Sequence, residues 1–104
     1  MSTSAVEISV PCAVDVRIVS NTLTVDLDDG RSVSVPISWF PRLAHGTPQE
    51  QSQWCFIGRG HGIHWEALDE DISVEGLIIG RPSNESQRSL DKWLKSRITR
   101  KSGT

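Results

Sequence analysis

The hydrophobic residues in the first third of this chain recur at every second position. Apolar and polar side chains alternate along residues 14–18, 22–27 and 32–35. A period of two sends successive side chains to opposite faces of a strand, and in the first segment Val14, Val16 and Ile18 share one face. Short polar turns separate the segments, and the second turn ends at Gly30. The pattern therefore predicts three antiparallel strands in a meander with one apolar face.

The next segment replaces this alternation with signals for short helices. Ser38 can cap a first short helix. Thr47 can cap a second helix, Pro48 suits its first position, and Glu50 can close a capping box. We therefore expect a short helix from Pro48 to about Trp54.

Glycines alternate with side chains at 58, 60 and 62, between two apolar segments. Glycine tolerates backbone angles that other residues avoid, so this spacing predicts bends, a bulge or a close backbone contact. Residues 54–57 and 62–65 are then a strand and its continuation or hairpin partner. The acidic run 69–71 is expected to lie at the start of a helical turn that Ser73 caps and Gly80 ends.

The period changes to that of a helix at residue 85. The apolar residues fall on one side, at Leu90, Trp93, Leu94 and Ile98, and basic residues fall on the opposite side, at Arg88, Lys92 and Lys95. We expect an α+β fold: a small antiparallel sheet, made of the meander plus one or two further strands, with short helices and an amphipathic C-terminal helix. Residues 1–83 would form the α+β domain, and residues 84–104 a basic helical extension.

The length and the charge distribution of the chain limit which kinds of protein it can be. A chain of 104 residues is enough for one domain. It carries no long apolar run and no signal-peptide pattern, so we expect a cytoplasmic protein without a membrane segment. Residues 1–80 hold four arginines against eleven carboxylates, net −7, whereas residues 81–104 hold seven cations against two carboxylates, net +5. A basic tail on an acidic body can attract the body itself, a second copy or an acidic partner.

The polar residues around the glycines invite a metal-site or hydrolytic hypothesis that uses His61, His64 and the carboxylates 69–71. Zinc needs three or four converging ligands, and two histidines three apart in a strand point to opposite faces. We therefore predict no metal, no cofactor and no enzymatic activity. Cys12 and Cys55 do not form a motif pair, and Cys55, between two aromatic residues, is expected to be a small buried thiol.

Two binding hypotheses remain. In the first, an aromatic patch binds a protein partner, because Trp and Arg dominate interfaces; its residues are Trp39, Phe40, Arg42 and Trp65. In the second, the basic tail binds nucleic acid through Arg88, Lys92, Lys95, Arg97, Arg100 and Lys101. Trp93 and Leu94 are apolar and must pack either on the sheet of the same chain or on a second copy, so a homodimer is a further alternative.

Several longer motifs resemble those of a bacterial family, the domain-of-unknown-function 2442 family. They are LDDGR at 27–31, PISWFPRL at 36–43, TPQE at 47–50 and GHGIHWEALDEDISVEGL at 60–77. The resemblance covers roughly residues 14–83, and ESQ at 85–87 with Trp93 and Leu94 resembles an extension that many members carry.

The resemblance implies a small α+β domain on an antiparallel sheet, with no established reaction and no catalytic residues to transfer. Members are often encoded beside a second small protein in what look like toxin–antitoxin gene pairs, and some are fused to a helix-turn-helix domain. Both associations imply binding and regulation, so the first expectation is a non-enzymatic, antitoxin-like partner of a neighbouring small protein.

Overall fold

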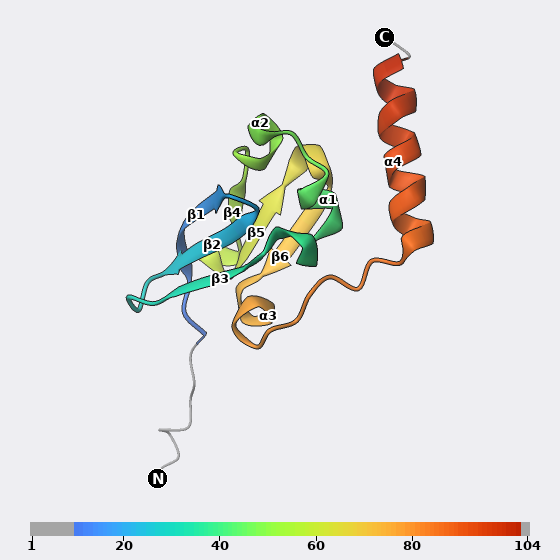
Figure 1. Ribbon diagram of the computed structural model, residues 1–104. Helices are drawn as coiled ribbons and strands as arrows, with labels where there is room; N and C mark the ends of the chain where they lie inside the picture. The colour runs from blue at the N-terminus through green and yellow to red at the C-terminus, as the bar shows by residue number, and fades with distance from the viewer. Residues whose placement is uncertain (1–9, 103–104) are drawn as a thin grey trace.

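The computed structural model describes residues 10–102, with side chains described up to residue 98. Figure 1 shows two small sheets, short helices around them and one long helix, α4, beside them. The strands are β1 (Ala13–Val19), β2 (Thr22–Leu27), β3 (Ser32–Pro36), β4 (Cys55–Ile57), β5 (Gly62–Trp65) and β6 (Glu70–Ser73). The α-helices are α1 (Pro41–Ala44), α2 (Pro48–Gln51), α3 (Val74–Ile78) and α4 (Gln87–Ser102). Among the described residues, single 3₁₀ turns are η2 (Ile37–Trp39), η3 (Gly58–Gly60) and η4 (Glu66–Leu68).

Each sheet is an antiparallel meander. The first has the strand order β1-β2-β3 and the second the order β4-β5-β6. The α+β class and the first meander are confirmed. The further strands, however, form a second sheet of their own rather than extending the first.

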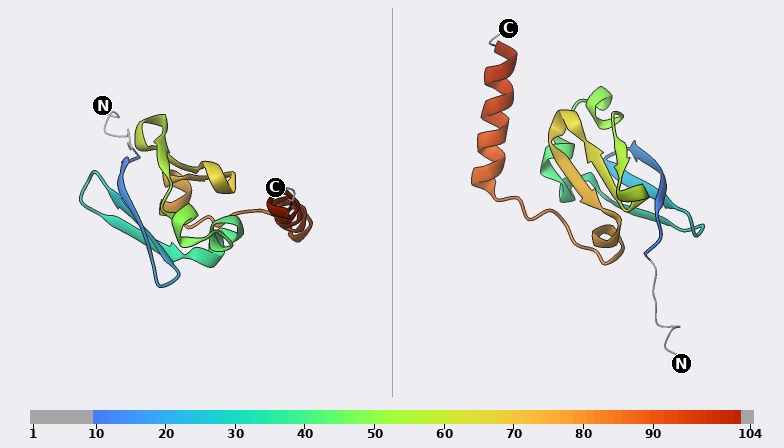
Figure 2. Two further views of the ribbon diagram at one scale, coloured as in Figure 1. Left: turned by 90° about the horizontal axis from the view of Figure 1, so that it is seen from above. Right: turned by 180° about the vertical axis from the view of Figure 1, so that it is seen from behind.

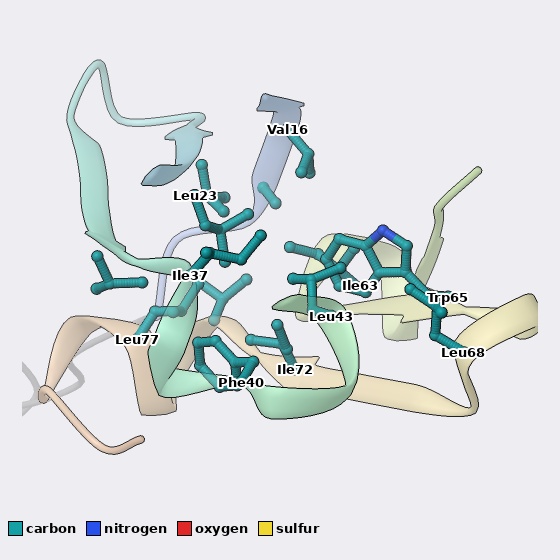
Figure 3. Packing of buried hydrophobic residues seen from close by; sticks show 14 of the residues in the cluster. Val16, Leu23, Ile37, Phe40, Leu43, Ile63, Trp65, Leu68, Ile72 and Leu77 are labelled. Atoms are coloured by element: carbon teal, nitrogen blue, oxygen red, sulfur yellow. The ribbon is translucent and has the colours of Figure 1, made fainter. Parts of the chain in front are cut away.

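One hydrophobic core joins the two sheets. Figure 3 shows Leu23 from the first sheet and Ile63 and Trp65 from the second, with Leu43 of α1 between them. All four of these side chains are fully buried. The core therefore depends on contacts between segments that lie far apart in the sequence.

A β-bulge in the first strand corrects the predicted alternation. The pairing of β1 with β2 shifts between Ala13 and Asp15. One extra residue in a strand reverses which side chains face inward beyond it. Consequently Ala13 and Val16 are buried, whereas Val14, which was expected in the core, is 55% exposed.

The acidic run was wrongly placed at the start of a helix. Asp69 adopts a left-handed conformation with φ of 51°, and the chain then enters the edge strand β6 at Glu70. Within this strand Glu70 and Ile72 face inward and Asp71 faces outward. The carboxylates therefore separate onto two faces instead of forming one polar turn.

The helix signals were partly right. Thr47 caps α2 in a full capping box with Glu50, as predicted, but the helix ends at Gln51. Ser73 caps α3 as predicted. Ser38 caps nothing, because η2 already begins at Ile37 and α1 begins at Pro41. Proline fits that first helical position because its missing N–H would have had no partner there.

The glycine stretch bends the chain, as its spacing predicted. A Cβ on Gly60 would lie 3.0 Å from the Ala13 carbonyl oxygen, and a Cβ on Gly62 would lie 2.9 Å from Ile57 Cγ1. Both contacts are closer than side-chain carbons normally allow. These glycines therefore let β1 pass close to η3 and let β4 and β5 pair as a hairpin.

Helix α4 stands beside the domain, on the side where α1 lies, at the end of an extended linker (Figures 1 and 2). Ser86 begins the helix, since its hydroxyl accepts the Ser89 N–H at 3.1 Å. Leu90 and Trp93 are each 8% exposed and belong to the main core, whereas Ile98, predicted on the same apolar side, is 67% exposed. Across residues 10–102, no helix has both the length and the apolarity to cross a membrane.

Candidate functional site

The residues of the predicted aromatic patch do not share one surface. Trp65 is fully buried and Phe40 is 4% exposed, and both point into the core in Figure 3. The indole N–H of Trp65 donates to the Gln51 carbonyl oxygen at 3.0 Å. Trp39 is half-buried. In this conformation Phe40 and Trp65 cannot touch a partner, because the domain itself covers them.

Arg42 connects α1 to the start of the C-terminal extension. Its Nε donates to Glu85 Oε1 at 2.7 Å and its Nη2 to Glu85 Oε2 at 2.8 Å. Its Nη1 donates to a side-chain oxygen of Asp69 at 3.1 Å. These hydrogen bonds raise the pKa of Arg42, chiefly through Glu85, and lower the pKa of Glu85. A paired, two-pronged contact of this kind fixes orientation as well as position.

Two guanidinium groups lie over the ring of Trp93 in α4. The Arg42 guanidinium carbon is 5.1 Å from the ring centroid and that of Arg97 is 4.8 Å from it. Cations over an aromatic face are attracted by its quadrupole. Arg97 also donates to Glu50 Oε1 at 2.9 Å, and this contact, largest of several, lowers the pKa of Glu50. Helix α4 is therefore held to the domain by one face.

The opposite face of α4 is exposed. Arg88, Lys92 and Lys95 all lie there, as the helical pattern predicted. Arg97 differs, because its guanidinium faces the domain and not the solvent. The side chains of Arg100 and Lys101, also predicted to bind nucleic acid, lie outside the described residues.

The two histidines lie apart. His61 is exposed at the end of η3, whereas His64 of β5 contacts Asp71 through Nδ1 and Glu66 Oε1 through Nε2, the latter at 2.8 Å. These contacts, with Glu66 first, raise the pKa of His64 and favour its charged form. In the described part of the chain, no three His, Cys, Asp or Glu side chains gather closely enough to hold a metal ion.

Cys55 pairs with His64 across β4 and β5 and is exposed, so the expectation of a buried thiol was wrong. The reason is that Cys55 lies on the outer face of an edge strand, away from the core. Cys12 is half-buried, and no disulfide joins the two thiols.

The burial of Glu70 was not predicted from the sequence. Its side chain turns inward from β6, with 8% of the residue exposed, and no described residue gives its carboxyl a hydrogen bond or an ion pair. Burial raises its pKa to about 7; Arg42 opposes the rise, and Glu85 adds to it. The sequence does contain a signal for this burial. A strand places residues i and i+2 on one face, so Glu70 shares a face with the apolar Ile72.

A hollow of about 270 Å³ lies against this edge of the second sheet. It is bounded by β6, by α3 and by the linker, and its lining includes Phe40, Glu70, Ser73, Gly76, Arg81 and Asn84. The site region thus combines two features: a docked helix with a basic outer face, and a hollow that contains a buried carboxyl.

Comparison with known proteins gives a family and no activity. The sequence model of a family described as "Protein of unknown function (DUF2442)" matches residues 13–83. No curated protein matches the chain.

Two solved structures are similar. A crystal structure of a protein of unknown function from Rhodospirillum rubrum has a TM-score of 0.65 at 29% identity, over 74% of this chain and 95% of that one. A solution structure of an uncharacterized protein from Chromobacterium violaceum has a TM-score of 0.61 at 22% identity, over 78% of this chain and 74% of that one; at this identity the likeness shows the fold alone.

The matched segment begins at β1 and ends in the linker, so it spans both meanders and leaves α4 outside. It contains the motifs at 27–31, 36–43, 47–50 and 60–77 that indicated the family from the sequence. On this match over more than half of its length, the chain belongs to the DUF2442 family of proteins of unknown function.

Proposed function

We propose that this protein is a non-enzymatic, regulatory binding module that presents the outer face of α4 to a protein partner with an acidic surface. The observation that carries the proposal is the two-sided use of this helix. One side is fixed to the domain, because Trp93 contacts Arg42 and Arg97 contacts Glu50. The other side exposes Arg88, Lys92 and Lys95. A helix that is already formed and anchored loses little conformational entropy when it binds.

A protein partner fits this face better than nucleic acid does. Ile98, at the border of this face, is 67% exposed, and an apolar side chain gains more from contact with a protein surface than with phosphate groups. The exposed face also carries Asp91 among its three described cations. Non-specific DNA binding depends on many phosphate contacts, and the three cations described on this face supply few of them.

The first partner to test is the product of the neighbouring gene, because the resemblance described above implies paired genes of the toxin–antitoxin kind. The full chain would be co-expressed with that product, and the affinity of the complex measured by calorimetry. We expect Lys92→Glu and Lys95→Glu each to weaken binding at least tenfold, because each places a carboxylate opposite the acidic surface of the partner.

Arg59→Glu is the matched control. Arg59 is exposed in η3, carries the same charge and lies outside α4, so its reversal should leave affinity unchanged. Equal losses in all three variants would reduce the effect to net charge and refute the proposal. Tight binding of DNA that weakens steeply with salt, without any protein complex, would refute it in favour of nucleic acid.

A further inference from the structure

The hollow beside β6 presents opposite charges from two parts of the chain. Glu70 contributes a carboxyl from the strand, and Arg81 and Asn84 contribute a guanidinium and an amide from the linker. No ion pair joins Glu70 to Arg81, and no described residue bonds to the Arg81 or Asn84 side chain. The hollow is thus lined by the carboxylates Glu70 and Asp71 and by the guanidinium of Arg81, and no ion pair joins Arg81 to either carboxylate.

The hydration of the Glu70 carboxyl is reduced but not lost. No described buried side-chain oxygen lacks a hydrogen-bond partner, so the Glu70 carboxyl oxygens, which have none, still reach solvent in the hollow. Partial burial disfavours an ionised carboxylate. Glu85, whose side chain is 9% exposed, offsets this cost by accepting two hydrogen bonds from Arg42 and one from Ser89. Glu70 has no such protein partner, and a bound group with N–H donors would supply one.

We propose that this hollow binds a small free α-amino acid, with its ammonium group on Glu70 and its carboxylate on Arg81 and Asn84. A zwitterion is the simplest ligand that matches both charges, because an ammonium ion needs acceptors and a carboxylate pairs well with a guanidinium. The volume of about 270 Å³ is just below the usual range for drug-sized ligands, roughly 300 to 1,000 Å³, and so suits only a small molecule. The site is independent of the outer face of α4 and does not rest on the proposed function.

The charges around Glu70 set the pH dependence of binding. Arg42 of α1 favours the ionised carboxyl, whereas Glu85 of the linker and Asp69 and Asp71 on either side of Glu70 oppose it. Since burial holds the pKa of Glu70 near 7, only part of the protein carries the carboxylate at neutral pH. Affinity for an ammonium group therefore rises between pH 6 and pH 7.5.

The test is a titration of the full, ¹⁵N-labelled chain, followed by NMR, with L-alanine, L-serine, L-threonine and L-asparagine taken singly. We expect at least one of these to shift the amide signals of residues 70–76 and 81–84 in a saturable way. L-alaninamide lacks the carboxylate and N-acetyl-L-alanine lacks the ammonium group, so both should bind at least tenfold more weakly. The absence of any shift at millimolar amino acid, or equal binding of the amide, would overturn the proposal.

Two variants locate the ligand. Glu70→Gln should weaken binding at least tenfold and abolish its pH dependence, and Arg81→Gln should weaken it by a similar factor. Glu75→Gln is the control, since Glu75 is an exposed carboxylate of α3 outside the lining. Unchanged binding in a folded Glu70→Gln variant, judged by its dispersed spectrum, would also overturn the proposal.

Discussion

Val14 and Val16 lie two positions apart in one strand, yet the structure gives them opposite environments. Val16 is 6% exposed and Val14 is 55% exposed, because the bulge lies between Ala13 and Asp15. Val16→Ala removes two buried methyl groups and should lower the free energy of unfolding by about 1.5 kcal/mol or more. Val14→Ala is the matched control and should change it by less than about 0.5 kcal/mol. Urea denaturation of both variants decides this, and equal losses would rule out the bulge.

Glu70 makes a separate prediction about pH. Its carboxyl titrates at about 7 in the folded chain, raised from 4.5, the usual value for an exposed glutamate. Between these values the unfolded chain loses its proton first, so this group lowers the stability of the fold as pH rises from 4.5 to 7 and adds no further loss above that range. Glu70→Gln cannot ionise, so relative to the native chain it should gain on the order of 2 kcal/mol between pH 4 and pH 8, once solvent screening is allowed for.

The measurement is urea unfolding of both proteins at a series of pH values, without amino acids in the buffer. Glu75→Gln again serves as the exposed control for replacing a glutamate by a glutamine. If the difference between Glu70→Gln and the native chain did not change with pH, burial would not raise the pKa of the Glu70 carboxyl.

At the scale of elements, α4 depends on Trp93 for its attachment. Trp93 is 8% exposed, and the guanidinium groups of Arg42 and Arg97 both lie over its ring. Trp93→Ala removes both the buried area and the two cation–π contacts, so hydrogen exchange along α4 should become at least tenfold faster. Exchange in β2 should hardly change, because its residues pack in the core between the two sheets.

Lys92→Ala provides the comparison for that experiment. It changes the neighbouring residue on the exposed face, so protection of α4 should match that of the native chain. If Trp93→Ala left the protection of α4 intact as well, the attachment would have to come from other contacts.

At the scale of the whole molecule, an ion pair joins segments 47 residues apart. Arg97 of α4 contacts Glu50 of α2, and the two side chains are 14% and 22% exposed. A double-mutant cycle with Glu50→Gln and Arg97→Gln should give a coupling free energy of about 1 kcal/mol, because the pair is partly shielded from water. Glutamine is the right replacement for Glu50, since it keeps the acceptor that closes the capping box with Thr47.

The same cycle at 1 M salt should give a smaller coupling, since added ions screen charges that water still reaches. A coupling indistinguishable from zero at low salt would show that the contact adds nothing to the attachment of α4.

The whole molecule also explains the uneven charge of the chain. The acidic body and basic tail meet at two places, Arg42 with Glu85 and Arg97 with Glu50. In the first of these the arginine belongs to the body and the carboxylate to the extension. The net charges of the body and the tail therefore do not predict how the two parts contact each other. The specific ion pairs, Arg42 with Glu85 and Arg97 with Glu50, decide which cations of the chain stay exposed.

The sequence by itself determined the local elements and the family. Alternating side chains predicted the first meander, Thr47 and Ser73 predicted two helix starts, and the 3.6-residue period predicted α4. These features depend on residues within about four positions of one another, and such interactions are readable from a single chain. The long motifs likewise indicated the DUF2442 family, which the match over residues 13–83 established.

Only the tertiary structure decided what each predicted element faces. The bulge that exposes Val14, the strand that buries Glu70, and the inward turn of Arg42 and Arg97 all follow from contacts between distant segments. The bond from Arg42 to Glu85 spans 43 residues. No local period records such a contact, because burial and charge pairing depend on which surfaces the fold brings together.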